Sequence, residues 1–408
     1  MATLAPTTAL PQTDGDVWDD AEHFSLVLGG PLFQLMRRAR LTDDALMLVR
    51  RRIISISLFA WLPLLVLSAL GGQLSGKSVS VPFLFDIEAH VRFLVVVPLL
   101  LLAEIVVHRR LYPVARAFLE RNLIPKGSIP RFDAAIRSAF RLRNSVLAEA
   151  LLVVAVYAIG ILIVWRRHTA LATTTWYLTS SAEGARLTPA GVWYACVSLP
   201  IFQFLLLRWY FRLFIWMRFL WQVAHIRLVL VPTHPDQLGG LGHLTNTVYA
   251  FAVLLLAHGA MVAAQIASRI FLLGATLPEF KVEIVVVVAF LLCVVLGPLL
   301  LFAPQLAQTK RTGLLEYGTL AERYVRDFDN KWLRRSAADG EALLGSSDIQ
   351  SLADLSNSFA VVRAMRLVPF TKTAFIELIG AVLVPVAPLL LTMMPMEALL
   401  KKLMGLLT

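Results

Sequence analysis

Long apolar stretches alternate with short basic or glycine-rich segments along almost the whole chain. A helix that crosses the hydrocarbon core of a bilayer needs about 20 mostly apolar residues. Seven stretches meet this requirement, at approximately residues 53–71, 91–107, 147–165, 192–215, 248–273, 283–305 and 374–396. The pattern therefore predicts an all-α integral membrane protein with seven transmembrane helices.

Lysine and arginine gather on one side of the predicted membrane. If connections and adjoining helix ends are assigned alternately to the two sides, 29 of the 38 basic residues fall on the side of the N-terminus and 8 on the other. Because cytoplasmic connections carry an excess of lysine and arginine, this bias sets the orientation. We expect a cytoplasmic N-terminus and a periplasmic C-terminus, which agrees with an odd number of spans.

Two predicted spans continue beyond the bilayer. The apolar and aromatic pattern of the fourth span runs on to about residue 227, which predicts a helix of ~60 Å, about twice the hydrocarbon thickness. After the sixth span, aromatic and leucine side chains recur at helical spacing over residues 310–335. The prediction is a seven-span membrane domain over residues 31–408 with long cytoplasmic helical extensions. Residues 306–371 form a cytoplasmic helical insertion within that domain.

The N-terminal residues 1–30 differ in character from the rest of the chain. They are acidic and lack the basic start of a signal peptide. We predict that they form a disordered acidic tail.

The composition agrees with a protein that has lipid as its solvent. The chain is 58% hydrophobic and only 16% charged, whereas about a quarter of the residues in soluble domains are charged. The net charge of +11 points to contact with anionic lipid on the cytoplasmic side. It does not point to nucleic acid, because no aromatic stacking platform accompanies the basic segments. Cys196 and Cys293 lie in apolar runs, so we expect no disulfide framework, no metal site and no cofactor.

A glycine-rich loop between the fourth and fifth spans holds a dense group of special residues. They are His234, Asp236, Gly239, Gly240 and Gly242. Consecutive backbone amides in such a turn, close to a helix N-terminus, can form a concavity that binds an anion or a lipid headgroup. Two alternatives stay open: a structural hairpin in which the Asp236 carboxylate satisfies those amides, and a metal or proton-transfer pair of His234 and Asp236.

Polar side chains also follow the fifth span. His258, Gln265 and Arg269 lie within about 40° of one another at 100° per residue. Glu377 and Thr392 fall roughly on one face of the last span, which contains several prolines. Since ionisable groups at membrane depth are costly and often functional, these five residues are candidates for a polar pathway. Interhelical packing is the alternative.

A carboxylate and an imidazole lie one turn apart near the end of the second span. They belong to Glu104 and His108. We interpret them as an interfacial hydrogen-bonded pair, with a proton relay as the alternative.

Several segments carry a resemblance to known proteins. Residues 348–359 and 361–370, together with the His234–Asp236 and Gly239–Gly242 segments, resemble an uncharacterised family of proteobacterial integral membrane proteins. This resemblance implies a location in the bacterial inner membrane. In topology alone, the predicted spans and prolonged helices are similar to the insect chemoreceptor-like seven-transmembrane channel superfamily, which implies a homo-oligomer with a pore lined by the last span.

These observations favour an oligomeric ion channel or pore-like protein. Three alternatives stay open: a secondary transporter, a membrane enzyme or lipid-handling protein that uses the loop at His234 and Asp236, and a non-catalytic membrane scaffold. No repeat of two related halves supports the transporter. No nucleophile elbow, zinc-protease or phosphate-loop motif supports an enzyme.

Overall fold

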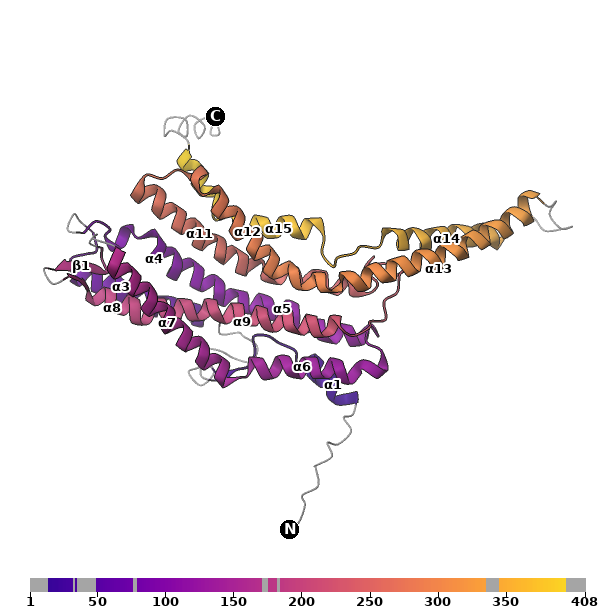
Figure 1. The fold of residues 1–408 in the computed structure, drawn as a ribbon, viewed down its shortest axis with the longest axis horizontal. Coiled ribbons are helices and arrows are strands. Elements are labelled where there is room, and N and C mark those ends of the chain that lie inside the picture. The colour runs from indigo at the N-terminus through magenta and orange to yellow at the C-terminus, as the bar shows by residue number, and fades with distance from the viewer. Residues whose placement is uncertain are drawn as a thin grey trace, which may run out of the picture.

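The computed structural model describes residues 14–31, 34, 49–75, 79–170, 175–181, 184–334 and 345–393. They form an elongated helical bundle from which one long helical hairpin projects (Figure 1). A small β-hairpin lies at the opposite end of the bundle from that projection (Figure 1). Its strands β1 (Leu178–Ser181) and β2 (Gly184–Leu187) pair antiparallel.

The bundle is built from helices of very different lengths. The α-helices are α1 (Asp14–Glu22), α3 (Val49–Leu70), α4 (Ile87–Val91), α5 (Val97–Glu120), α6 (Ile129–Arg143), α7 (Val146–Ala170), α8 (Pro189–Trp193), α9 (Leu199–Ala224), α10 (Thr245–Val248), α11 (Ala252–Leu273), α12 (Lys281–Leu296), α13 (Ala303–Asp329), α14 (Ser347–Ala364) and α15 (Lys372–Leu383). Two π-helical turns, η2 (Arg92–Val96) and η4 (Tyr194–Ser198), lie directly before α5 and α9. The 3₁₀ turns are η1 (Phe83–Phe85), η3 (Lys126–Ser128), η5 (Leu241–Leu244), η6 (Tyr249–Phe251), η7 (Leu277–Phe280), η8 (Gly297–Phe302) and η10 (Ala387–Met393), and η9 (Asn330–Arg334) is π-helical.

Five of the continuous helical stretches are long and apolar enough to cross a membrane. They are Val49–Leu70, Ile87–Glu120, Pro189–Ala224, Leu241–Leu273 and Leu277–Leu300. The last predicted span consists of α15 and η10, which are bent by 56° at their junction and count as a sixth if they form one span. The apolar part of α7 is short over Val146–Ala158, and the predicted third span extends past it into residues whose side chains are not described. An all-helical fold with several apolar helices is confirmed, whereas the count of seven stays a prediction.

Large apolar side chains cover the outside of these helices. On α12, for example, Val282, Val285, Val286 and Phe290 are all more than half exposed. Contiguous exposed apolar surface of this kind is rare on soluble monomers and suits contact with lipid tails. The interior of the bundle is instead closely packed: Gly259 of α11 lies so near α15 that a methyl group there would meet the Val382 carbonyl oxygen at 2.2 Å. The absence of a side chain at Gly259 therefore allows close helix packing at this crossing.

The prediction of a disordered tail over residues 1–30 is wrong for its second half. Residues 1–13 lie outside the described part of the chain, but Asp14–Glu22 form α1, which packs against α5 and α6. Val17, Ala21 and Phe24 are buried, while Glu22 is exposed. The acidic composition hid this apolar face, which is recognisable only from its helical spacing.

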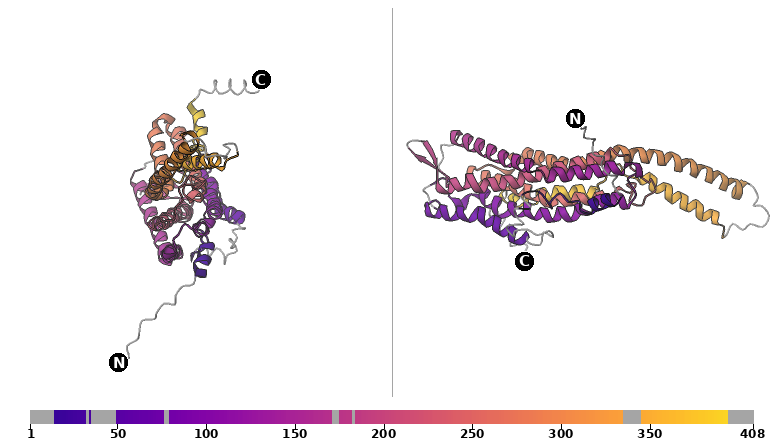
Figure 2. Two further views of the ribbon diagram at one scale, coloured as in Figure 1. Left: turned by 90° about the vertical axis from the view of Figure 1, so that its right-hand side faces the viewer. Right: turned by 90° about the horizontal axis from the view of Figure 1, so that it is seen from below.

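The projecting hairpin, which we call the arm, consists of α13 and α14. These helices run antiparallel beside each other and reach well beyond the bundle (Figures 1 and 2). Tyr324 donates to the carbonyl of Asp348, and the Trp332 indole donates to its carboxylate. The predicted helical insertion at residues 306–371 is thus present as a pair of helices.

Candidate functional site

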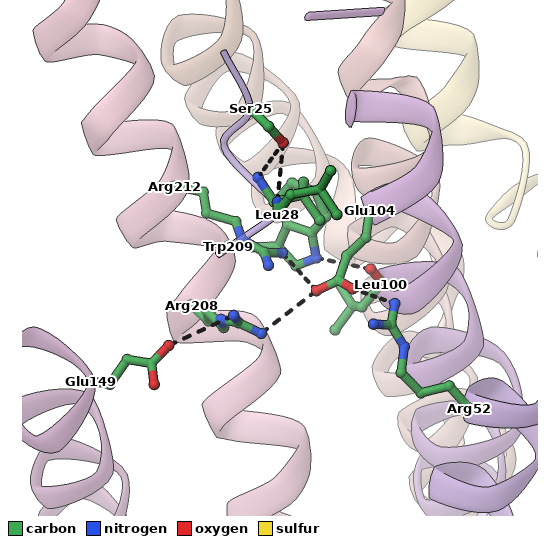
Figure 3. A network of polar contacts seen from close by, with 10 residues as sticks. Ser25, Leu28, Arg52, Leu100, Glu104, Glu149, Arg208, Trp209 and Arg212 are labelled. Atoms are coloured by element: carbon green, nitrogen blue, oxygen red, sulfur yellow. Dashed lines mark hydrogen bonds and ion pairs between the residues drawn. The ribbon is translucent and has the colours of Figure 1, made fainter. Parts of the chain in front are cut away.

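A buried network of charged side chains joins four helices in the middle of the bundle (Figure 3). Its centre is Glu104 of α5, which is 3% exposed. Arg52 from the first turn of α3 donates to one oxygen of this carboxylate. Arg212 of α9 donates to the other oxygen at 2.7 Å. Trp209 of α9 supports the arrangement, because its ring lies 5.0 Å from the Arg212 guanidinium and its N–H donates to a backbone carbonyl of α5.

Arg208 is held differently from the other two arginines. Its guanidinium lies between two carboxylates, 3.8 Å from Glu104 and 3.6 Å from Glu149 of α7 (Figure 3). Both separations exceed hydrogen-bond distance, and no described residue accepts a hydrogen bond from Arg208. The side chain is nevertheless only 8% exposed. A guanidinium carries five donors in a planar fork, so Arg208 retains donor capacity for an acceptor that fits beside it.

The network carries more positive than negative charge. Three guanidinium groups face two carboxylates, which leaves a surplus of one positive charge among these five side chains. In addition, the Arg52 Nε atom is buried with no hydrogen-bond partner in the described part of the chain. Burying an unbalanced charge is expensive unless further groups compensate it. The site is therefore suited to an anion.

An apolar groove begins one helical turn from this network. Its volume is about 650 Å³, and it lies between α3, α7, and the η4–α9 stretch. Its walls include Ser55, Phe59, Val153, Tyr157, Cys196 and Phe204. Ser55, Val153 and Phe204 are three or four positions from Arg52, Glu149 and Arg208 respectively, so each lies on the same helix face as its charged neighbour. We call this hollow the α7 groove; on each of the three helices its lining stops about one turn short of a network residue.

A second apolar groove lies between α9 and α12, and we call it the α12 groove. Its volume is about 720 Å³. Its walls include Tyr210, Met217, Trp221, Phe290, Cys293 and Leu301. Arg218 is the charged residue in its lining, and this side chain is exposed and lies 3.4 Å from the Ser138 hydroxyl.

The predicted anion loop is occupied by its own carboxylate. Asp236 accepts hydrogen bonds from the backbone amides of Leu238 at 2.8 Å, Gly240 at 3.2 Å and Gly242 at 2.7 Å. Partial burial raises the pKa of the Asp236 carboxyl, but the three amide donors outweigh it, so the pKa lies below its ordinary value. The loop is therefore the structural hairpin that the sequence analysis gives as an alternative, with its amides bound by Asp236. His234 Nδ1 lies 2.9 Å from the same carboxylate.

The loop instead connects distant parts of the chain. Arg121 at the end of α5 donates to the Gly240 carbonyl at 3.0 Å. Arg366, which follows α14, donates to the Asp236 carbonyl at 3.1 Å. Gly239 and Gly240 have positive φ angles of 64° and 103°, which glycine adopts without strain. The loop ties the base of the arm to the bundle.

The candidate pathway residues do not line one route. His258 is buried, and both of its ring nitrogens have partners. Its Nδ1 lies 2.8 Å from the Leu254 carbonyl oxygen, and its Nε2 lies 2.8 Å from the Tyr210 hydroxyl. Gln265 borders a separate 200 Å³ pocket with Glu88 and Arg92. The contacts of His258 therefore match the packing alternative, and the separate location of Gln265 does not fit a continuous polar path.

The other three pathway candidates are also apart. Arg269 lies 3.5 Å from Glu283 at the start of α12. Glu377 is exposed on α15, whose buried residues are Ala374, Leu378 and Val382. The Thr392 hydroxyl donates to the Leu389 carbonyl.

The predicted Glu104–His108 pair is wrong. Glu104 binds arginines, while His108 contacts the Ser25 hydroxyl at 2.9 Å. Sequence reasoning also missed Arg52, Arg208 and Arg212 as partners of one carboxylate. A usable signal was present, since Arg208 and Arg212 lie four positions apart inside an apolar helix, where unpaired arginines are rare.

The fold and its lipid-like outer surface define a helical protein of the multi-pass membrane class. Searches of protein-family models, curated proteins and solved structures found no match to this chain. Among the described residues, no group of three or more His, Cys, Asp or Glu side chains could hold a metal ion.

Proposed function

We propose that this protein binds an anionic amphiphile within the membrane and acts as a non-enzymatic lipid-handling protein. The anionic headgroup lies beside Arg208, and the hydrocarbon chain lies in the α7 groove. The observation that carries the proposal is Arg208 itself: a buried guanidinium with no hydrogen bond to a described residue, one helical turn from the lining of an apolar groove. Arginine matches phosphate and carboxylate geometry better than lysine does.

The proposed orientation of the protein in the membrane predicts which leaflet holds the amphiphile. By the excess of basic residues, the α6–α7 junction lies at the cytoplasmic boundary of the bacterial inner membrane. Glu149 and Arg208 lie at that level, so the headgroup belongs to the inner leaflet. From Arg208 to Cys196, the groove extends about 18 Å toward the outer side at 1.5 Å per residue. That length accommodates a large part of one acyl chain.

Selectivity in this proposal comes from the headgroup. A hydrocarbon chain that moves from lipid into an apolar groove gains little, because lipid tails are as apolar as the groove. A charge-assisted hydrogen bond to Arg208 contributes about 1.5–3 kcal/mol, which corresponds to roughly a tenfold or greater preference over a headgroup without net charge.

An oligomeric pore is the second candidate, and one observation favours it. Glu377 is exposed on an apolar helix that is part of the last span. A carboxylate at membrane depth faces water or another protein surface, because contact with lipid costs about 2.5–3.5 kcal/mol or more. A homo-oligomer with α15 at its centre provides such surroundings.

The test of the lipid proposal is native mass spectrometry of the purified protein. Delipidated protein is titrated with phosphatidylglycerol or with phosphatidylcholine, and bound lipid is counted. We expect a preference for phosphatidylglycerol that Arg208→Gln reduces at least about tenfold. Arg208→Lys, which keeps the charge without the planar fork, retains part of the preference.

Arg218→Gln is the matched control, because it removes an arginine of the same helix that lines the α12 groove. Its lipid preference should equal that of the wild type. Equal binding of both lipids by the wild-type protein, or equal losses in the two Gln variants, contradicts the proposal.

A further inference from the structure

The segment that joins α1 to the bundle lies across the buried network. We call residues 24–30 the strap. Phe24 packs among aromatic rings, with its centroid 4.7 Å from that of Phe219 and 6.5 Å from that of Trp216. Leu26 and Val27 are 2% and 1% exposed. The strap is therefore bound to the bundle by apolar contacts over most of its length.

Three polar contacts hold the strap, two at the α6–α7 junction and one on α5. Arg143, the last residue of α6, donates to the Ser25 carbonyl at 2.7 Å. Asn144 accepts a hydrogen bond from the Gly30 amide at 3.0 Å. The Ser25 hydroxyl lies 2.9 Å from His108 Nδ1 of α5. The strap thus connects α5, α6 and the start of α7.

The strap backbone lies directly against residues of the network. A methyl group on Gly30 would lie 3.0 Å from the Glu149 carboxylate, the same group that faces Arg208. A methyl group on Gly29 would lie 2.7 Å from the Arg143 guanidinium. Both glycines have positive φ angles, 122° and 89°, which let the chain approach this closely. Figure 3 shows Ser25 and Leu28 next to the network on the side of Arg212.

Arg143 links the strap to the surplus charge. Its hydrogen bonds go to a backbone carbonyl and to the side-chain amide of Asn144, which are both neutral. Burial and, to a smaller extent, the positive charge of Arg212 together lower the pKa of Arg143 to about 10. The network therefore repels the residue that holds the strap. An anion at Arg208 offsets the surplus and weakens that repulsion.

We infer that the strap is a cover for the headgroup site, closed when an anionic amphiphile is bound and loosened when the site is empty. This inference rests on the proposed function. Coupling between two sites is reciprocal, so a loosened strap also lowers the affinity for the amphiphile. Gly29 and Gly30, the polar contacts of the strap and the charge of Arg143 together couple the strap to the headgroup site.

The test reads strap opening with a thiol on the strap. In a background with Cys196→Ser and Cys293→Ser, Val27→Cys places a thiol at a buried strap position and leaves Ser25 intact. The labelling rate with a membrane-impermeant maleimide is measured on full-length protein in detergent with phosphatidylglycerol or with phosphatidylcholine. We expect labelling to be several-fold slower with phosphatidylglycerol. Arg143→Gln should make it fast with both lipids.

A thiol elsewhere separates strap opening from loosening of the whole bundle. Ala135→Cys lies on α6, is also buried, and is not part of the strap. Its labelling rate should not depend on lipid. A rise at both positions, or equal strap rates in the two lipids, overturns the inference.

Native mass spectrometry of the same samples tells the two proposals apart. If phosphatidylglycerol is bound selectively while the strap rate is constant, the strap is merely structural and the proposed function stands. If no selective binding is found, the proposed function and the inference both fail.

Discussion

Helix α9 separates two apolar grooves of nearly equal size, yet their surroundings differ in charge. The α7 groove has a volume of about 650 Å³, and one helical turn from its lining Arg208 lies buried between two carboxylates. The α12 groove has a volume of about 720 Å³, and its lining holds only the exposed Arg218. In a membrane, any apolar groove is filled by lipid tails. The comparison therefore teaches that a selective site is recognised by what lies at the end of a groove, because volume and apolarity are the same in both.

The neighbouring polar groups sharpen this contrast. The Tyr210 hydroxyl of the α12 groove already lies 2.8 Å from His258 Nε2. Arg208 at the α7 groove has ion pairs but no hydrogen bond to a described residue. Only the Arg208 guanidinium therefore has strong hydrogen-bond donors left for a ligand.

The largest expected effect comes from removing the centre of the network. Glu104→Gln leaves three arginines without their shared carboxylate, and breaking a buried pair costs about 3–5 kcal/mol. The free energy of unfolding in mixed detergent micelles measures this loss. Glu283→Gln is the matched control, since its ion pair with Arg269 is substantially exposed and contributes less than about 1 kcal/mol. Similar losses in the two variants would show that the network does not stabilise the bundle.

The next largest effect is expected on lipid binding when a bulky side chain fills one of the two grooves. Val153→Trp places a large side chain in the α7 groove, and Val294→Trp does the same in the α12 groove. We expect the first variant to lose selective binding of phosphatidylglycerol by about tenfold, and the second to keep it. Lipid counts from native mass spectrometry measure both. If only Val294→Trp loses selective binding of phosphatidylglycerol, the lipid site is the α12 groove and not the α7 groove.

A smaller effect uses the two native thiols as reporters. Cys196 lines the α7 groove and Cys293 the α12 groove, and both are exposed. In detergent, adding phosphatidylglycerol instead of phosphatidylcholine should slow maleimide labelling of Cys196 a few-fold. The rate at Cys293 should be the same with both lipids. Equal responses would mean that headgroup charge does not control occupancy.

The smallest effect concerns the Asp236 loop, which borders neither groove. The pKa of Asp236 is lowered in the folded protein, so its contribution to stability is present above the unfolded value of about 4 and is lost as pH falls below it. The loss is about 1–3 kcal/mol, given hydrogen bonds from three amides to one carboxylate. Asp236→Asn should remove this acid dependence without changing lipid preference. Unfolding measured as a function of pH tests it, and an unchanged acid dependence in the variant refutes it.

Much of the fold could be predicted from local pattern. Five apolar helices, the bend in the last span and the helical arm follow from residue properties within windows of about 20 positions. The helix α1 was missed because its apolar face is only three residues wide. The sequence predicts a tight glycine-rich loop at His234–Gly242 but leaves open whether its amides bind Asp236 or an external anion, since that depends on where the carboxylate points.

The sequence by itself predicts a helical membrane protein with most of its basic residues on one side, because hydropathy and charge are local properties that any short window reveals. The tertiary structure alone decided which charges meet: Glu104 contacts Arg52 and Arg212 from distances of 52 and 108 positions along the chain. It also decided that Glu377 is exposed and that the α7 groove lies one helical turn from Arg208. Such pairings depend on how helices rotate and pack against one another, and helix periodicity leaves that rotation undetermined.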